Sequence, residues 1–378
     1  MRAPFMYGKL AEKENFVDRV QERAMLKTWL SSGINVMIIS PRRWGKSSLV
    51  KTAMDELTAE DKTIRVCHLD AFSIRTEEEF HQRFAAAIID ACSSEFEKKV
   101  SDIRQFIENI VPGVTFQTDA TNSISFDFRL RLPERNKDEL LNLPEKIAAK
   151  KGIRLIICID EFQHLSELSG YKELEARMRG IWQHQQHVSY CLYGSKRHMM
   201  TEIFNNSANP FYRFGQLLFL QKIPKQEWVP FIVDRFEQSG KEISAESAGQ
   251  ICDWVQCHSW YVQQLCFFVW TNTTGQVTPE ILQRSLTQLI STNEPMFQND
   301  VDELTTPQVA MLKAIRDGQQ QLNAAATVEK YQLGNGQTIT RNKRILAERD
   351  FIEQTAGKGP YQFCDPIFEL WFRQNFKS

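Results

Sequence analysis

The sequence predicts an α/β fold with a parallel sheet, followed by an all-helical region and a C-terminal winged helix-turn-helix. Three observations predict it. The apolar run Ile34 to Ile39 leads through a tight loop into a helical pattern, the strand–loop–helix order that a phosphate-binding loop requires. The run Arg154 to Ile159 is almost continuously apolar, as expected of a central parallel strand buried on both faces. Residues 224–294 show helical spacing only, and residues 304–378 show three short helices before a hairpin.

Length and composition are those of a globular protein with more than one domain. The 378 residues suggest two or three domains, which we place at 1–223, 224–300 and 301–378. The formal net charge of −1 gives no overall attraction to nucleic acid or to a membrane. The apolar runs are too short to span a membrane, and the scattered cysteines fit a reducing compartment. We therefore expect a cytoplasmic protein without a membrane partner.

The stretch after the first predicted strand resembles a phosphate-binding loop. It reads Ser40-Pro41-Arg42-Arg43-Trp44-Gly45-Lys46-Ser47-Ser48. Backbone N–H groups of such a loop, together with the N-terminus of the next helix, attract phosphate oxygens. We expect these nine residues to bind ATP, with Lys46 at the β- and γ-phosphates and Ser47 in the Mg²⁺ shell. Ser40 stands where the motif has its first glycine.

An acidic pair follows the central apolar strand. Asp160 and Glu161 come directly after Ile159, at the strand end where α/β sheets bind ligands. We expect Asp160 to hold Mg²⁺ through water and Glu161 to orient and deprotonate the attacking water. Buried carboxylates are costly unless they meet a cation, so a purely structural role is the weaker explanation. With Lys46, the pair predicts ATP hydrolysis.

Three further residues are candidates, each with a simpler alternative. Ser195 follows the strand-like run Val188 to Tyr193 and could sense the γ-phosphate, or be an ordinary turn serine. Arg213 could stabilise charge within the chain or across a subunit contact, or form a surface salt bridge. Phe16 could form one wall of an adenine pocket, or simply pack.

The remaining elements follow from periodicity. A packing helix follows Asp18, alternating β-formers predict a strand at 63–69, and alternation between 112 and 132 predicts an inserted β-hairpin. Helical spacing predicts helices at about 77–92, 137–150, 174–186, 226–238, 245–256, 260–271 and 279–290.

The C-terminal region is predicted to be a winged helix-turn-helix. Its presumed recognition helix, 338–348, carries Arg341, Asn342 and Arg344, residue types that contact phosphates and base edges. From Leu304 onward, ten Lys and Arg stand against seven Asp and Glu, a net charge of +3. DNA contact and protein docking both remain open for this domain.

These strings together resemble the archaeal-type ATPase family, a group of AAA-related P-loop ATPases. The resemblance covers almost the whole chain and rests on the loop from Pro41, on Asp160-Glu161-Phe162-Gln163, on Asn209-Pro210-Phe211-Tyr212-Arg213, and on Asp365 to Trp371. It implies a sheet of strand order 5-1-4-3-2, a helical lid and a winged helix.

The chain departs from the family pattern in two places. Asp18 replaces the glycine usual in the F-x-G-R box, and His258-Ser259-Trp260 stands where relatives often have Gly-x-Pro. The first departure weakens the assignment of Phe16 to the nucleotide, and the second makes a sensor in the lid doubtful.

Three functional hypotheses follow. The first is an ATP-driven switch in which hydrolysis moves the lid and the winged helix. The second is a DNA-binding protein whose nucleotide site controls assembly, which leaves a homo-oligomer open. The third is a docking module that holds ATP or ADP with little turnover.

Overall fold

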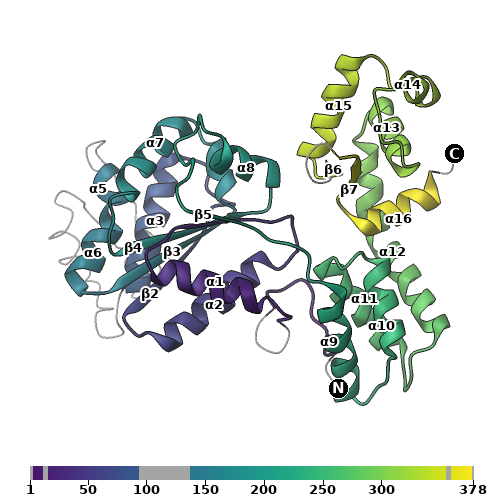
Figure 1. Ribbon diagram of the computed structural model, residues 1–378, viewed down its shortest axis with the longest axis horizontal. Helices are drawn as coiled ribbons and strands as arrows, with labels where there is room; N and C mark the ends of the chain where they lie inside the picture. Colours follow the sequence, from purple (N-terminus) through teal and green to yellow (C-terminus); the bar gives the residue numbers. More distant parts are fainter. Residues whose placement is uncertain (1–2, 12–15, 93–136, 355–358, 377–378) are drawn as a thin grey trace, which may run out of the picture. The chain divides into compact units, whose positions relative to one another are not determined.

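The computed structural model describes residues 3–11, 16–92, 137–354 and 359–376. The hairpin predicted near 112–132 lies outside these ranges. The chain divides into two compact units (Figure 1), one formed by Arg19–Gln221 and the other by Met1–Asp18 with Lys222–Ser378. The predicted division into three domains stays a prediction.

The unit Arg19–Gln221 is built on a five-stranded parallel sheet. Its strands lie in the order β2-β3-β4-β1-β5, which confirms the predicted order 5-1-4-3-2 read from the other edge. The strands are β1 (Val36–Ile39), β2 (Ile64–Asp70), β3 (Arg154–Asp160), β4 (Val188–Gly194) and β5 (Gln216–Phe219). Because all pairs are parallel, the loops after β1, β3 and β4 leave the same edge of the sheet.

Helices cover both faces of this sheet. Figure 1 shows α1 and α2 on one side, with α3 and α5 to α8 on the other. The helices are α1 (Val20–Ser31), α2 (Lys46–Glu60), α3 (Glu77–Cys92), α5 (Lys137–Leu141), α6 (Leu143–Lys151), the 3₁₀ helix η4 (Phe162–Glu167), α7 (Tyr171–Trp182) and α8 (Arg197–Asn205). The single helix predicted at 137–150 is two helices, because Pro144 has no N–H to continue α5 and lies instead in the first turn of α6.

The strands that carry the site are buried. Every residue of β4 is buried, as are Leu155 to Ile159 of β3. On one face, the Trp182 ring stacks on Tyr190 of β4 with centroids 4.1 Å apart, and Phe84 stacks on Trp182. Close packing of this kind fixes where each strand ends, and therefore where the polar groups after it lie.

The second unit is mostly helical and ends in the predicted winged helix. Its elements are α9 (Lys225–Gln238), α10 (Ala245–Trp254), α11 (Ser259–Asn272), α12 (Pro279–Asp302), α13 (Thr306–Arg316), α14 (Ala325–Tyr331), α15 (Gly336–Glu348), β6 (Ile352–Gln354), β7 (Tyr361–Phe363) and α16 (Pro366–Asn375). Helix α12 is longer than the predicted 279–290, and it continues through Pro295.

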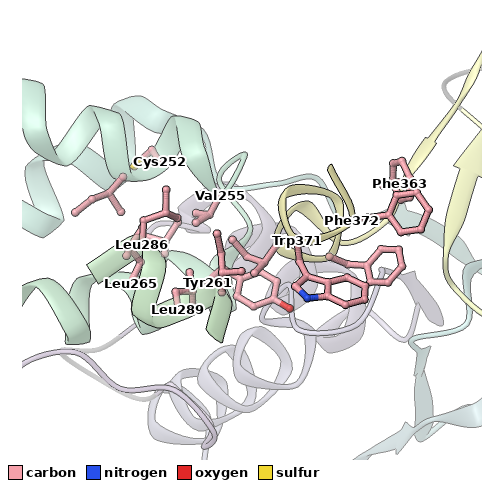
Figure 2. Close-up of a cluster of buried hydrophobic side chains, with 14 of the residues drawn as sticks. Cys252, Val255, Tyr261, Leu265, Leu286, Leu289, Phe363, Trp371 and Phe372 are labelled. Carbon is pink, nitrogen blue, oxygen red and sulfur yellow. The ribbon is translucent and has the colours of Figure 1, made fainter. Parts of the chain in front are cut away.

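One hydrophobic cluster runs from the helices α10 to α12 into the winged helix. Figure 2 shows Tyr261 and Leu265 of α11 on one side of it and Trp371 and Phe372 of α16 on the other. Tyr261 and Leu265 are fully buried, so this face of α11 belongs to the core of the second unit.

Candidate functional site

The loop between β1 and α2 has the backbone of a phosphate-binding loop. Gly45 has φ 87° and lies at the N-cap of α2, and Arg43 has φ 65°. Left-handed residues turn successive N–H groups toward one side, which makes a concave anion site at the helix N-terminus. A Cβ on Gly45 would meet no atom within 4 Å, so the backbone angle, rather than space, requires glycine there.

Lys46 lies at the centre of the candidate site and is 6% exposed. Its Nζ lies 2.5 Å from Oδ1 of Asp160 and 3.3 Å from Oε1 of Glu161. The same Nζ lies 4.8 Å from the ring centroid of Tyr193, which forms its apolar wall. The Ser47 hydroxyl donates to Oδ2 of Asp160 at 2.6 Å. The structure therefore brings together residues 114 and 115 positions apart, as the sequence predicted.

The Glu161 carboxylate is held by three side chains, those of Lys46, Gln163 and Ser195. Glu161 has φ 49°, and its Oε2 accepts from Nε2 of Gln163 at 2.6 Å and from the Ser195 hydroxyl at 2.7 Å. Burial raises the pKa of Glu161, but the Lys46 charge and these hydrogen bonds outweigh burial, so the net shift is downward. Glu161 is therefore an ionised carboxylate at neutral pH.

Gln163 was missed as a site residue by sequence reasoning. Its side chain is fully buried and packs against Gly194, the last residue of β4. A Cβ on Gly194 would lie 1.8 Å from Oε1 of Gln163, so only glycine leaves room for this amide. Gln163 belongs to the string Asp160 to Gln163, which was the one available signal.

Arg19 is a second residue that sequence reasoning missed. It is 3% exposed, pairs with Glu22 at 2.9 Å, and donates to the carbonyl of Trp44 in the loop at 3.4 Å. Asp18 before it has φ 53°, a left-handed angle that glycine adopts most easily. This backbone angle is the one that suits the glycine of the F-x-G-R box with which the sequence was compared.

The other residues predicted for the nucleotide site range from fully buried to exposed. Ser40 is fully buried, and its hydroxyl donates to the carbonyl of Pro41. Arg42 is exposed on the loop and Ser48 is buried in the first turn of α2. Arg213 is exposed, has φ 55°, and lies over the Tyr212 ring at 5.1 Å, so a catalytic role for it stays a prediction.

Phe16 belongs to the other compact unit, Met1–Asp18 with Lys222–Ser378. Its side chain is half-buried. Its assignment to the wall of an adenine pocket stays a prediction.

In the winged helix, one of the three residues predicted to contact a partner is buried. Arg341 and Arg344 of α15 are exposed, but Asn342 is 6% exposed and its side chain faces the domain interior. The prediction that Asn342 contacts a partner is wrong, because the helical turn directs it toward the core while its neighbours face outward. Lys343 and Tyr361 line a cleft of about 400 Å³ beside the wing.

The donor set suits a magnesium nucleotide. The Ser47 hydroxyl and the Asp160 carboxylate are hard oxygen ligands of the kind that Mg²⁺ takes, and they already lie within hydrogen-bonding distance. One ammonium faces two carboxylates here, which leaves a negative charge that a divalent cation would balance. A buried lysine behind a concave loop of N–H groups defines the site of a P-loop ATPase.

Comparison with known families identifies the chain. Residues 16–265 match a family described as "ATPase domain predominantly from Archaea", and residues 295–374 match one described as "Probable winged helix domain". Because the first match covers more than half of the 378 residues, the chain belongs to this archaeal-type ATPase family. The predicted resemblance is confirmed.

Solved structures show the same fold. A Walker-type ATPase of Pyrococcus abyssi is similar over 98% of this chain and 99% of its own, with a TM-score of 0.70 and 17% identity. The Aeropyrum pernix ORC2 protein, solved as ADPNP-ADP complexes, is similar over 99% and 100%, with a TM-score of 0.60 and 12% identity. At these identities the likeness concerns the fold alone. No curated protein matches the chain.

The helices that the structure describes lie within residues 16–92, 137–354 and 359–376. None of the helices in those ranges is both long and apolar enough to cross a bilayer.

Proposed function

We propose that the chain binds ATP with Mg²⁺ and hydrolyses it, and that the nucleotide state acts as a switch for the helical and winged-helix regions. The observation that carries this proposal is the convergence of Lys46, Asp160 and Glu161 beside the loop at Gly45. A buried lysine and two half-buried carboxylates cost free energy to bring together unless they serve a ligand or each other.

The phosphates of ATP would lie on the loop N–H groups and against Lys46. Lys46 would then exchange its contact with Glu161 for the β- and γ-phosphate oxygens. Ser47 and Asp160 would hold Mg²⁺, which when bound neutralises charge on those oxygens.

Glu161 is the group best suited to take a proton from water. Its pKa is held down by Lys46, Gln163 and Ser195, so loss of the Lys46 contact to phosphate would raise its basicity. Ser195 donates to the same carboxylate oxygen as Gln163 does, so it can report on the orientation of Glu161. Ser195 is therefore proposed as a sensor that acts through Glu161.

Equilibrium binding of ATP tests the proposal. Lys46→Ala is expected to weaken Mg-ATP binding by about 100-fold or more, since it removes a buried charge-assisted contact to phosphate. Lys51→Ala is the matched control, because Lys51 lies one turn further along α2 and pairs with Asp55 at 3.0 Å. It should change affinity by less than about threefold. Equal effects of the two variants would refute the assignment.

A second candidate function is DNA binding by α15. The exposed Arg341 and Arg344, and the net charge of +3 from Leu304 onward, favour it. Binding should fall with salt, and Arg341→Ala with Arg344→Ala should flatten the log–log salt slope by about 2. Arg373→Ala is the control, because Arg373 lies on α16 and pairs with Glu369. Absence of any salt-dependent binding would leave protein docking as the use of this domain.

A further inference from the structure

Helix α10 ends in a turn that brings two cysteines together. The N–H of Cys257 donates to the carbonyl of Cys252 at 2.8 Å, and that of Gln256 donates to the carbonyl of Asp253 at 3.1 Å. These two bonds define a Schellman motif, in which the third residue from the helix end contacts the second residue beyond the cap. Both positions of that contact are cysteines here, and Figure 2 shows Cys252 near Val255 at this end of the helix.

The backbone of the turn holds the second cysteine against the helix. Gln256 has φ 49° and Cys257 has φ 54°, so two consecutive residues without a glycine are left-handed. Cys252 is fully buried, whereas Cys257 is half-buried. A small reagent in solvent can therefore reach Cys257 while Cys252 stays sheltered behind it.

The two thiols differ in acidity. The hydrogen bond from the Cys252 S–H, followed by the nearby Lys222 charge, lowers the pKa of Cys257 from 9.0 to about 7 despite its burial. The pKa of Cys252 is raised, first by its hydrogen bond with Cys257 and then by burial. A thiolate beside a protonated thiol is the arrangement found in reactive cysteine pairs.

We propose that Cys252 and Cys257 are a redox-sensitive pair that a hydroperoxide converts into a reversible disulfide. The Cys257 thiolate attacks a peroxide oxygen, the O–O bond breaks, and the hydroxide released takes a proton to become water. The Cys252 sulfur then attacks the Cys257 sulfur, the S–O bond breaks, and the leaving hydroxide takes the Cys252 proton. Two thiols lose two electrons in total, and hydrogen peroxide is reduced to two molecules of water.

The turn also carries contacts from the lid helices to the winged helix. Gln256 donates to Glu369 of α16 at 3.3 Å. The ring of His258, the residue after Cys257, lies 4.8 Å from that of Tyr261, whose hydroxyl donates to Asp365 at 2.5 Å. A disulfide would fix the turn to which these contacts attach, so oxidation would act where α10 and α11 meet α16.

Peptide mapping of the full chain tests the proposal. The reduced protein is treated with hydrogen peroxide, denatured, alkylated, and cleaved before Asp253, which separates Cys252 from Cys257. The two peptides are expected to stay linked until dithiothreitol is added, and Cys257→Ser is expected to abolish the link. A link from Cys257 to Cys266, to Cys364 or to a second chain would overturn the proposal, as would oxidation of Cys257 to sulfinic acid alone.

Alkylation of the native protein gives an independent readout. At pH 7, a thiol with a pKa of about 7 rather than 9.0 is expected to react roughly sixfold faster, once its lower nucleophilicity is included. Cys252→Ala removes the S–H donor, so the pH midpoint of Cys257 should rise toward 9.0. Cys266→Ala makes the same change in a buried thiol on α11 and should leave the midpoint near 7. Identical profiles for the two variants would contradict the proposed pairing.

Discussion

The close contact between Gly194 and Gln163 predicts how sensitive the site is to a single methyl group. In Gly194→Ala, the new Cβ would lie 1.8 Å from Oε1 and 3.0 Å from Cδ of Gln163, and 2.8 Å from Sδ of Met200. Gln163 and Met200 are both fully buried, so neither has solvent to move into. Overpacking of this kind costs about 1–3 kcal/mol of unfolding free energy.

Gly180→Ala is the matched control for that change. Gly180 lies in α7 on the same unit, and a Cβ there would meet nothing within 4 Å. Alanine in an exposed helix is more stable than glycine by about 0.5–1 kcal/mol, so this variant should be stabilised. The two glycine-to-alanine changes should therefore differ in stability by about 1.5–4 kcal/mol, with opposite signs.

Denaturant unfolding measures the stability difference, and ATP turnover supplies a second readout. If Gln163 moves, it withdraws its hydrogen bond from Glu161, so Gly194→Ala should also lower turnover by about tenfold, the effect of roughly 1.4 kcal/mol. Gly180→Ala should keep the wild-type rate. Wild-type stability and wild-type turnover in Gly194→Ala would refute the account of how Glu161 is positioned.

Three further predictions concern single side chains. Burial raises the pKa of Glu175, which is 3% exposed, from 4.5 to about 7, so the folded state binds the extra proton between these pH values and stability falls as pH rises through them. Glu175→Gln should remove roughly 2–3 kcal/mol of this pH-dependent loss of unfolding free energy. Denaturant unfolding at several pH values up to 8 should therefore give a flatter stability profile. Asp365 caps α16 through two N–H groups and accepts from Tyr261, so Asp365→Ala should cost about 2 kcal/mol in denaturant unfolding; Asn335, which caps α15 through one backbone N–H, should cost about 1 kcal/mol when changed to Ala. Ser195→Ala should slow ATP turnover by about tenfold while Mg-ATP affinity stays within about threefold, and a large loss of affinity would place Ser195 at the phosphates instead.

The centre of the site could be predicted because its residues lie in two short, contiguous sequence motifs. Gly45, Lys46 and Ser47 form one string after a strand, and Asp160 with Glu161 follows another. Since the carboxyl ends of parallel strands meet at one edge, two local patterns sufficed to expect Lys46 and Asp160 at one site, although 114 positions separate them.

The supporting residues could not be predicted, because their roles depend on packing between distant elements. Arg19 reaches the loop only after α1 has packed beside α2. In the sequence, Tyr193 cannot be told apart from other residues of a buried strand. Only the structure shows that Lys46 lies over its ring. Asn342 has a residue type suited to base edges, but its position on α15 turns it inward, so composition was misleading there.

Lys46, Asp160 and Glu161 are proposed to act together on magnesium-bound ATP, and the rate of ATP hydrolysis measures that joint action. The wild-type chain is expected to show Mg²⁺-dependent turnover, and Glu161→Gln is expected to lose about 100-fold or more of it with ATP still bound. Bound nucleotide without turnover in the wild type would favour a structural role for ATP. Equal hydrolysis rates in the wild type and in Glu161→Gln would contradict the claim.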